Sequence, residues 1–414
     1  MNPQAKVPYK WTFRTQFRRG GFGWRSQPAI VRVRQAVGEI KKVARKDPML
    51  AAEGAVLFIE RVSPALERID SSSGAMGAAV NRAVDELAAI VGGASADGAT
   101  RDRWLERIWA AYLDDDMGYL GSLEEAWGEL CGAPETASAW ADLLVDAVRD
   151  SWRPGHSGYL RGTIVCLSAL FRAERYTELI ELVEHARYIT WSYREWGFRA
   201  LVALGRRAEA LRYAEASRDR NENGAAISRA CEEMLLASGF AEEAYRRYGL
   251  DATFRATNLA TFQALAKKYP SKAPAELLRD LVASTPGSEG KWFAAAKTAG
   301  LYDEAIYVAG LSPCDPKTLA RAARDFDEER PAFAMEASLL ALRWIGEGWG
   351  YEITSLDVTD AYASGKRAAE QLDRVAEFVA RATAIVCSGI PFLRECLKGA
   401  LDAETVQDQA PSSR

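Results

Sequence analysis

The chain has 414 residues, of which 48% are hydrophobic and 27% charged, and its formal net charge is −4. This length suffices for two or three domains or for one elongated array, and the apolar fraction is that of a folded chain. Uncharged apolar runs stay well below the ~18 residues of a membrane span, and the six cysteines contain no CxxC pair. Composition therefore excludes a membrane protein, a small disulfide-rich scaffold and a disordered chain, and we expect a cytoplasmic protein with no membrane partner.

Residues 1–27 form a basic arm that is rich in aromatic residues and glycine. Residues 1–50 hold twelve Lys or Arg but only Glu39 and Asp47 as acids, a net charge of +10 that leaves −14 for the rest of the chain. No apolar core follows these first charges, so we do not expect a secretory signal. Such an asymmetry predicts that the arm meets an acidic surface.

Two interpretations of this arm are open. Arginine neutralises phosphates and aromatic rings stack on bases, a composition suited to single-stranded nucleic acid. The residues that would make these contacts are Arg14, Arg18, Arg19, Phe22, Trp24 and Arg25. Alternatively, the arm docks on the acidic body of the protein itself, and its aromatic side chains cover the end of a helical array.

Helix signals follow the arm along the chain. From about Ala29 the apolar residues recur at spacings of three and four. The pairs Asp47-Pro48, Ser63-Pro64 and Asp315-Pro316 each predict a helix start, with a capping residue before a proline at the first helical position. Strand signals are nearly absent, and the best of them, residues 351–359, stands alone. The sequence therefore predicts an all-α protein.

A repeated triplet of Gly, Glu four residues later and Ala five residues later organises the middle of the chain. The copies are Gly205/Glu209/Ala210, Gly239/Glu243/Ala244 and Gly300/Glu304/Ala305. Degenerate copies begin at Glu174 and Lys272, so the spacing stays near the 34 residues of a helix–turn–helix repeat. Gly can end one helix in the left-handed conformation, Glu favours the first turn of the next, and the small Ala lets the two helices approach closely.

These triplets, and the aliphatic positions after them such as Leu211 and Ile306, resemble the tetratricopeptide repeat family over roughly residues 160–330. The resemblance implies a right-handed α-solenoid of antiparallel helix pairs that binds proteins. The Trp and Leu-Gly of that family's first helix and its terminal Pro are mostly missing here, so its binding residues do not carry over.

The expected organisation has five parts. They are the arm at 1–27, a helical bundle or HEAT-like region at 28–150, tetratricopeptide-like repeats at 151–330, capping helices at 331–401 and a polar tail at 402–414.

Residues able to carry out chemistry are sparse. Only His156 and His185 are histidines, and the cysteines lack the spacing of zinc ligands. No phosphate-binding loop, GxSxG elbow or HExxH motif occurs. We therefore expect no catalytic residues, no cofactor and no metal. The acidic run 114–116 is interpreted as a solvated loop rather than a cation site.

Aromatic and arginine residues gather at 187–199, within the predicted repeats. Helical-repeat proteins use such residues on a concave face as peptide anchors. The candidate partner contacts are Arg187, Trp191, Arg194, Trp196, Arg220 and Tyr245, in a groove around residues 187–220 and 245–262. An equally weighted alternative is that these aromatic and arginine side chains pack between repeats instead of binding a partner.

We expect a non-enzymatic protein-binding scaffold whose partner is a protein or peptide of unknown identity. The alternative is a nucleic-acid-associated protein that binds the phosphate backbone through its basic arm.

Overall fold

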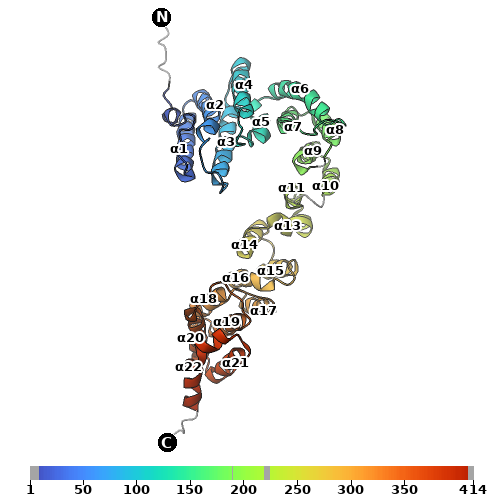
Figure 1. Ribbon diagram of the computed structural model, residues 1–414. Coiled ribbons are helices and arrows are strands. Elements are labelled where there is room, and N and C mark those ends of the chain that lie inside the picture. Colours follow the sequence, from blue (N-terminus) through green and yellow to red (C-terminus); the bar gives the residue numbers. More distant parts are fainter. Residues whose placement is uncertain (1–8, 189, 219–223, 409–414) are drawn as a thin grey trace. The chain divides into compact units, whose positions relative to one another are not determined.

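The computed structural model describes the backbone of residues 9–188, 190–218 and 224–408, with side chains as far as Leu401. Within these residues the chain is helical with connecting loops and contains no strand, which confirms the all-α prediction (Figure 1). None of the described helices combines the length and the apolar character that crossing a membrane requires. Packing divides the chain into two compact units, Met1–Ile227 and Ser228–Arg414.

The first unit begins with a short 3-10 turn, η1 (Thr12–Thr15), followed by ten α-helices and the start of an eleventh. Their bounds are α1 (Ser26–Ala44), α2 (Pro48–Ala65), α3 (Ala75–Gly93), α4 (Gly98–Leu113), α5 (Leu123–Cys131), α6 (Pro134–Ser151), α7 (Thr163–Arg172), α8 (Tyr176–Glu184), α9 (Trp191–Ala203), α10 (Arg207–Glu215) and α11 (Gly224–Ala237). The division between the units falls inside α11.

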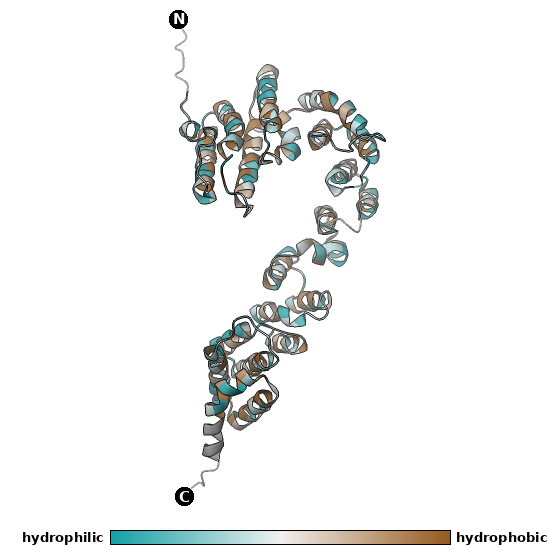
Figure 2. Ribbon diagram, viewed as in Figure 1, coloured by the Kyte–Doolittle hydropathy of each residue, from teal (hydrophilic) through white to brown (hydrophobic). Residues whose placement is uncertain are grey.

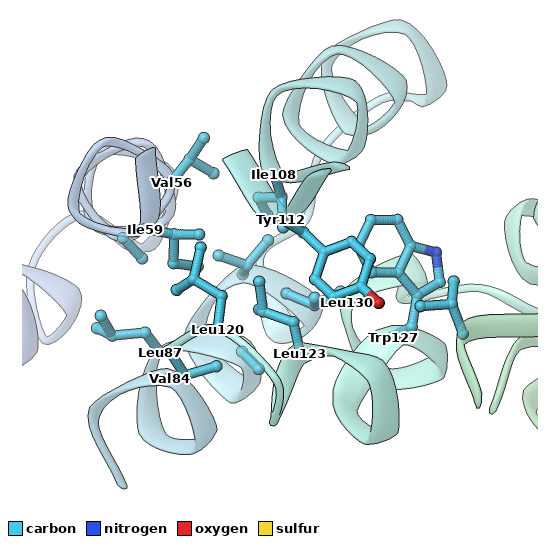
Figure 3. Packing of buried hydrophobic residues seen from close by; sticks show 14 of the residues in the cluster. Val56, Ile59, Val84, Leu87, Ile108, Tyr112, Leu120, Leu123, Trp127 and Leu130 are labelled. Atoms are coloured by element: carbon cyan, nitrogen blue, oxygen red, sulfur yellow. The ribbon is translucent and has the colours of Figure 1, made fainter. Parts of the chain in front are cut away.

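Helices of the first unit pack against their near neighbours along the chain. Helix α1 contacts α2 and α3, and a continuous row of contacts then runs from α3 to α5, α7 and α9. Both hydrophilic and hydrophobic residues lie on most helices, as expected for amphipathic helices packed side by side (Figure 2). Buried apolar side chains such as Val56, Leu87, Ile108 and Leu123 converge between α2, α3, α4 and α5 (Figure 3).

The second unit contains the remaining elements. They are α12 (Ala241–Ala244), the π-helical turn η2 (Tyr245–Gly249), α13 (Leu250–Thr253), α14 (Asn258–Lys268), α15 (Pro274–Ala283), η3 (Glu289–Trp292), α16 (Phe293–Thr298), α17 (Tyr302–Leu311), α18 (Pro316–Asp325), α19 (Pro331–Gly346), α20 (Ser355–Gln371), α21 (Val375–Ser388) and α22 (Pro391–Asp408). Its own core runs from Tyr245 to Leu397.

Local helix signals were confirmed at two of the three predicted starts. Asp47 accepts the N–H of Leu50 at 2.9 Å at the start of α2, and Asp315 caps α18 in the same way. The start at Ser63-Pro64 was wrong, because α2 continues through Pro64 to Ala65. Ser63 is buried there and donates its hydroxyl to a carboxylate of the α4–α5 loop, so a tertiary contact replaces the expected cap.

The isolated strand signal at 351–359 was also wrong. Helix α20 begins inside it, at Ser355. The hydroxyl of Thr354 accepts the N–H of Asp357, and the Asp357 carboxylate accepts the N–H of Thr354. This reciprocal capping box fixes the helix start and outweighs the β-propensity of the flanking residues.

The predicted helix ends at the triplets were confirmed in their backbone geometry. Four register positions adopt positive φ, namely Glu174 (60°), Gly205 (76°), Gly239 (82°) and Gly300 (75°). In each, the following residue donates its N–H to the carbonyl five positions earlier, at 2.9–3.0 Å. This bond is the signature of a Schellman helix end. The alanines of the three full triplets, Ala210, Ala244 and Ala305, are completely buried.

Candidate functional site

An open groove of about 640 Å³ is the strongest candidate site in the first unit. It crosses the row of helices α3, α5, α7 and α9. Its lining includes Ala89, Gly92, Gly93, Glu125, Ala126, Gly128, Glu129, Gly132, Ser168, Phe171, Arg172, Trp196 and Arg199. A surface built from four separate helices is positioned by the packing of the unit rather than by a single loop.

Small residues allow the helices beneath this groove to lie close together. A Cβ atom on Gly92 would come within 2.2 Å of the Glu129 carbonyl oxygen, and one on Gly128 within 2.6 Å of the Ser168 carbonyl oxygen. The buried Ser168 hydroxyl accepts the Gly128 N–H at 2.9 Å and donates to the Glu125 carbonyl at 2.8 Å. These contacts fix α7 against α5.

Two arginines supply positive charge to the groove. The Arg199 guanidinium lies over the rings of Trp196, at 4.4 Å, and Phe171, at 5.0 Å. Arg172 donates to the Gly132 carbonyl at 2.5 Å. Both arginines are exposed, and neither forms an ion pair with a carboxylate of the described residues.

Two carboxylates supply the opposite charge. Glu125 and Glu129 lie one helical turn apart on α5, both are exposed, and neither pairs with a cation in the described part of the chain. The groove thus presents charges of both signs that are not neutralised internally. Such a surface can take a ligand with complementary charges of both signs.

The predicted partner-binding residues do not lie together as exposed anchors of one groove. Trp191, Trp196 and Tyr245 are buried, with 7%, 4% and 6% of their surface exposed, so these side chains pack between helices instead of standing free as anchors. Tyr245 belongs to the second unit, where it donates to Asp280 at 2.6 Å. Among the members of the predicted set that the structure describes, only Trp196 lines the groove, and it does so beneath Arg199.

The remaining predicted contacts are arginines. Arg187 is exposed and donates to the His156 carbonyl at 2.6 Å. Arg194 is largely covered, lying 4.0 Å from the centre of the Tyr213 ring and donating to Ser217. Arg220 lies outside the described residues.

The N-terminal arm docks on the body of the first unit through its aromatic residues. Trp11, Phe13, Phe17 and Phe22 are 6%, 2%, 1% and 3% exposed, and Phe17 lies 5.3 Å from Phe58 of α2. The ring of Phe22, one of the predicted nucleic-acid contacts, is therefore not free to stack on a base.

The other arm residues proposed for nucleic acid lie on the surface. Trp24 is 71% exposed, and Arg14, Arg18 and Arg25 are exposed as well. Arg19 forms an exposed ion pair with Glu67 at 2.8 Å.

Arg172 and the glycines beneath the groove were not predicted from the sequence, and Arg199 belongs to the predicted aromatic and arginine cluster at 187–199 but not to the chosen partner contacts. One local signal was present, because Arg199 follows Trp196 by three residues and so lies on the same helix face. The glycines gave no such signal. Their role depends on which helices approach each other, and that is a property of the tertiary packing.

Groups with nucleophilic or metal-binding chemistry are scattered. The described residues contain no cluster of three or more His, Cys, Asp or Glu that could hold a metal ion. His156 and His185 are exposed, and the Nδ1 atom of His185 lies 2.6 Å from the Glu181 carbonyl. Within the acidic run, Asp115 is buried and accepts the Leu120 N–H at 2.6 Å, whereas Asp114 and Asp116 are exposed.

Exposed cysteines should react with thiol reagents faster than buried ones. Burial raises the pKa of Cys131, Cys166 and Cys314 to about 12, so almost no thiolate forms on them at pH 8. We expect the exposed Cys387 to react first with a colorimetric disulfide reagent and Cys396 more slowly. The buried thiols, Cys231 included, should react only when denaturant is added. Rapid labelling of three or more thiols in the native protein would contradict this expectation.

No known protein family matches the chain, and a comparison with curated proteins finds no match either.

Proposed function

We propose that the protein is a non-enzymatic scaffold that binds a segment of a protein partner in the groove over α3, α5, α7 and α9. One observation carries this proposal: the groove holds two arginines and two glutamates that lack ion-pair partners within the described chain. We further propose that the helix pairs whose two helices are joined at Glu174, Gly205, Gly239 and Gly300 are tetratricopeptide-like repeats of a right-handed α-solenoid. Their common Schellman ends, and the contacts of α7 with α8 and of α9 with α10, support this assignment.

The groove suits an extended peptide segment with side chains of both charges. Arg172 and Arg199 come from α7 and α9, whereas Glu125 and Glu129 come from α5, so the two signs are carried by different helices. Arg199 is held over two aromatic rings, which reduces the conformational entropy that binding a carboxylate would cost it.

A cytoplasmic location forms part of the same proposal. None of the six cysteines takes part in a disulfide, and four of them are buried as thiols. Chains that keep such thiols are typical of reducing compartments.

Removing the two positive charges of the groove is the direct test. The double variant Arg172→Gln/Arg199→Gln leaves the buried core untouched, because both side chains are exposed. Full-length tagged protein, purified from its native cells after nuclease treatment, should carry a stoichiometric protein partner. We expect the double variant to retain at least tenfold less of that partner, because two charge-assisted contacts are lost.

Matched variants on neighbouring surfaces control for charge and for stability. Arg207→Gln/Arg212→Gln on α10 removes the same charge from exposed positions outside the groove. A steric pair uses α3, where a side chain on Gly93 enters open space at the groove and one on Gly77 enters open space away from it. Equal partner recovery with Gly93→Gln and Gly77→Gln, together with an unaffected charge variant, would overturn the proposal.

A further inference from the structure

Helix α1 carries a surface whose positive charge the protein does not neutralise. The apolar side of α1, with Ile30, Val33, Val37 and Ile40, is buried. Its solvent side therefore displays cations along the helix. The exposed cations of α1 and the residues directly after it are Arg34, Lys41, Lys42, Arg45 and Lys46.

Few carboxylates oppose these charges. Within residues 9–50, Arg19 pairs with Glu67 and Lys41 pairs with Glu86 at 2.7 Å. The other basic residues of this segment form no ion pair within the described chain, and they are Lys10, Arg14, Arg18, Arg25, Arg32, Arg34, Lys42, Arg45 and Lys46.

A cavity between α1 and α3 brings two of these cations, Arg34 and Lys41, together with Arg82 of α3. It has a volume of about 330 Å³, and Arg34, Lys41, Arg82 and Glu86 line it over a floor of small and branched apolar residues. Lys41 engages Glu86, whereas Arg34 and Arg82, which also line the cavity, form no ion pair within the described residues. A tetrahedral anion such as a phosphate matches this donor set.

A second cavity lies on the opposite flank of α1. Its volume is about 400 Å³, and its charged lining consists of Arg32, Lys42 and Glu39. Glu39 accepts the N–H of Thr12 at 2.9 Å. Gly38 borders both cavities, so the two lie on either side of one ridge of α1.

The chemistry of this surface favours a phosphate backbone over two other polyanions, a membrane surface and single-stranded nucleic acid. A membrane-surface helix inserts an apolar face into the lipid, but the apolar face of α1 is occupied by the protein core. Single-stranded nucleic acid is held by the stacking of successive bases on several rings, but Trp11, Phe13, Phe17 and Phe22 are buried, and Trp24 is the one exposed tryptophan or phenylalanine among the described residues of the arm. What the surface does offer is a row of cations, and these recognise a phosphate backbone without reading bases.

We propose that the exposed face of α1, together with Arg82 of α3, binds the phosphate backbone of duplex nucleic acid without sequence preference. The proposal is independent of the groove over α3, α5, α7 and α9. From Arg34 to Arg45 the helix rises roughly 16 Å, a length over which duplex DNA carries on the order of ten phosphate charges. Phosphates of the two strands would enter the flanks of α1, one of them between Arg34 and Arg82.

Fluorescence anisotropy with the full-length chain and a labelled 20-base-pair DNA of arbitrary sequence tests this proposal. Binding should weaken steeply as the salt concentration rises. Arg34→Gln/Arg82→Gln should reduce affinity by about tenfold per lost phosphate contact near 0.1 M salt and lower the slope of log K against log salt by about two. Arg279→Gln/Lys398→Gln, which removes the same charge from exposed positions of the second unit, should leave both quantities unchanged.

A glycine substitution keeps the test independent of folding. A Cβ on Gly38 meets no atom within 4 Å, and the same is true of Gly399 in α22. Both Gly→Glu changes raise helix propensity, so neither should lower the melting temperature. We expect Gly38→Glu to abolish duplex binding and Gly399→Glu to leave it intact.

Several outcomes would overturn the proposal. They are no binding of the duplex at about 50 mM salt, equal affinity of the α1 variants and their controls, tighter binding of a single strand than of the duplex, and binding of phosphatidylserine vesicles in place of the duplex.

Discussion

Replacing Arg101 with leucine should lower the free energy of unfolding by about 3–5 kcal/mol. Arg101 is only 6% exposed, and its guanidinium donates to four backbone carbonyls. The acceptors are Val91, Gly92 at 3.3 Å, Ala94 at 2.6 Å and Leu130 at 3.2 Å. The last carbonyls of a helix have no partner within the helix, so Arg101 satisfies the ends of α3 and α5 together. Leucine would remove the partner of the Gly92 and Leu130 carbonyls, whereas the Val91 and Ala94 carbonyls would keep the N–H groups of Ala94 and Ala96.

Urea unfolding followed by tryptophan fluorescence measures this loss, since the Arg101 guanidinium lies 5.5 Å from the centre of the Trp104 ring. Arg103 provides the matched control, because it is exposed two residues away and donates to the Thr100 hydroxyl at 3.2 Å rather than to the helix ends. Arg103→Leu should change stability by less than about 0.5 kcal/mol. If both variants unfold at the same urea concentration, the proposed role of Arg101 in joining the helix ends is wrong.

The helix ends were largely predictable because their signals are local. Gly205, Gly239 and Gly300 end helices where the sequence predicts it, and Glu174 adopts the same left-handed conformation at the position where the triplet lacks glycine. Local propensity failed where another contact was stronger. At Ser63 the hydroxyl bonds to the α4–α5 loop.

The groove was less predictable because four helices contribute to it. Arg199 and Gly128 are far apart in sequence and line the same groove because α5, α7 and α9 pack together. Arg101 was missed for the same reason. In the charged run 101–103 it resembles a surface residue, and the converging ends of α3 and α5 bury it. Periodicity indicates which face of a helix is apolar but not which other helix covers it.

Truncating Phe17 to alanine should destabilise the protein by about 3–5 kcal/mol, as expected for a large side chain removed from a core. Phe17 is 1% exposed, and its ring centre lies 5.8 Å from that of Phe13, 5.1 Å from Phe22 and 5.3 Å from Phe58. Thermal unfolding followed by circular dichroism would measure the loss. The neighbouring variant Arg18→Ala changes an exposed side chain and should shift stability by less than about 0.5 kcal/mol.

The same pair of variants separates the two interpretations of the arm. If the arm were a free nucleic-acid clamp, Phe17→Ala would leave stability unchanged and weaken binding to single strands. With its rings packed on α2, Phe17→Ala should instead destabilise the first unit, while Arg18→Ala removes one exposed positive charge from a stable protein. Because the arm belongs to the core, deleting residues 1–46 would remove α1 and expose apolar side chains of α2 and α3. Point substitutions at exposed cations are therefore the sound way to test nucleic-acid binding at this end of the chain.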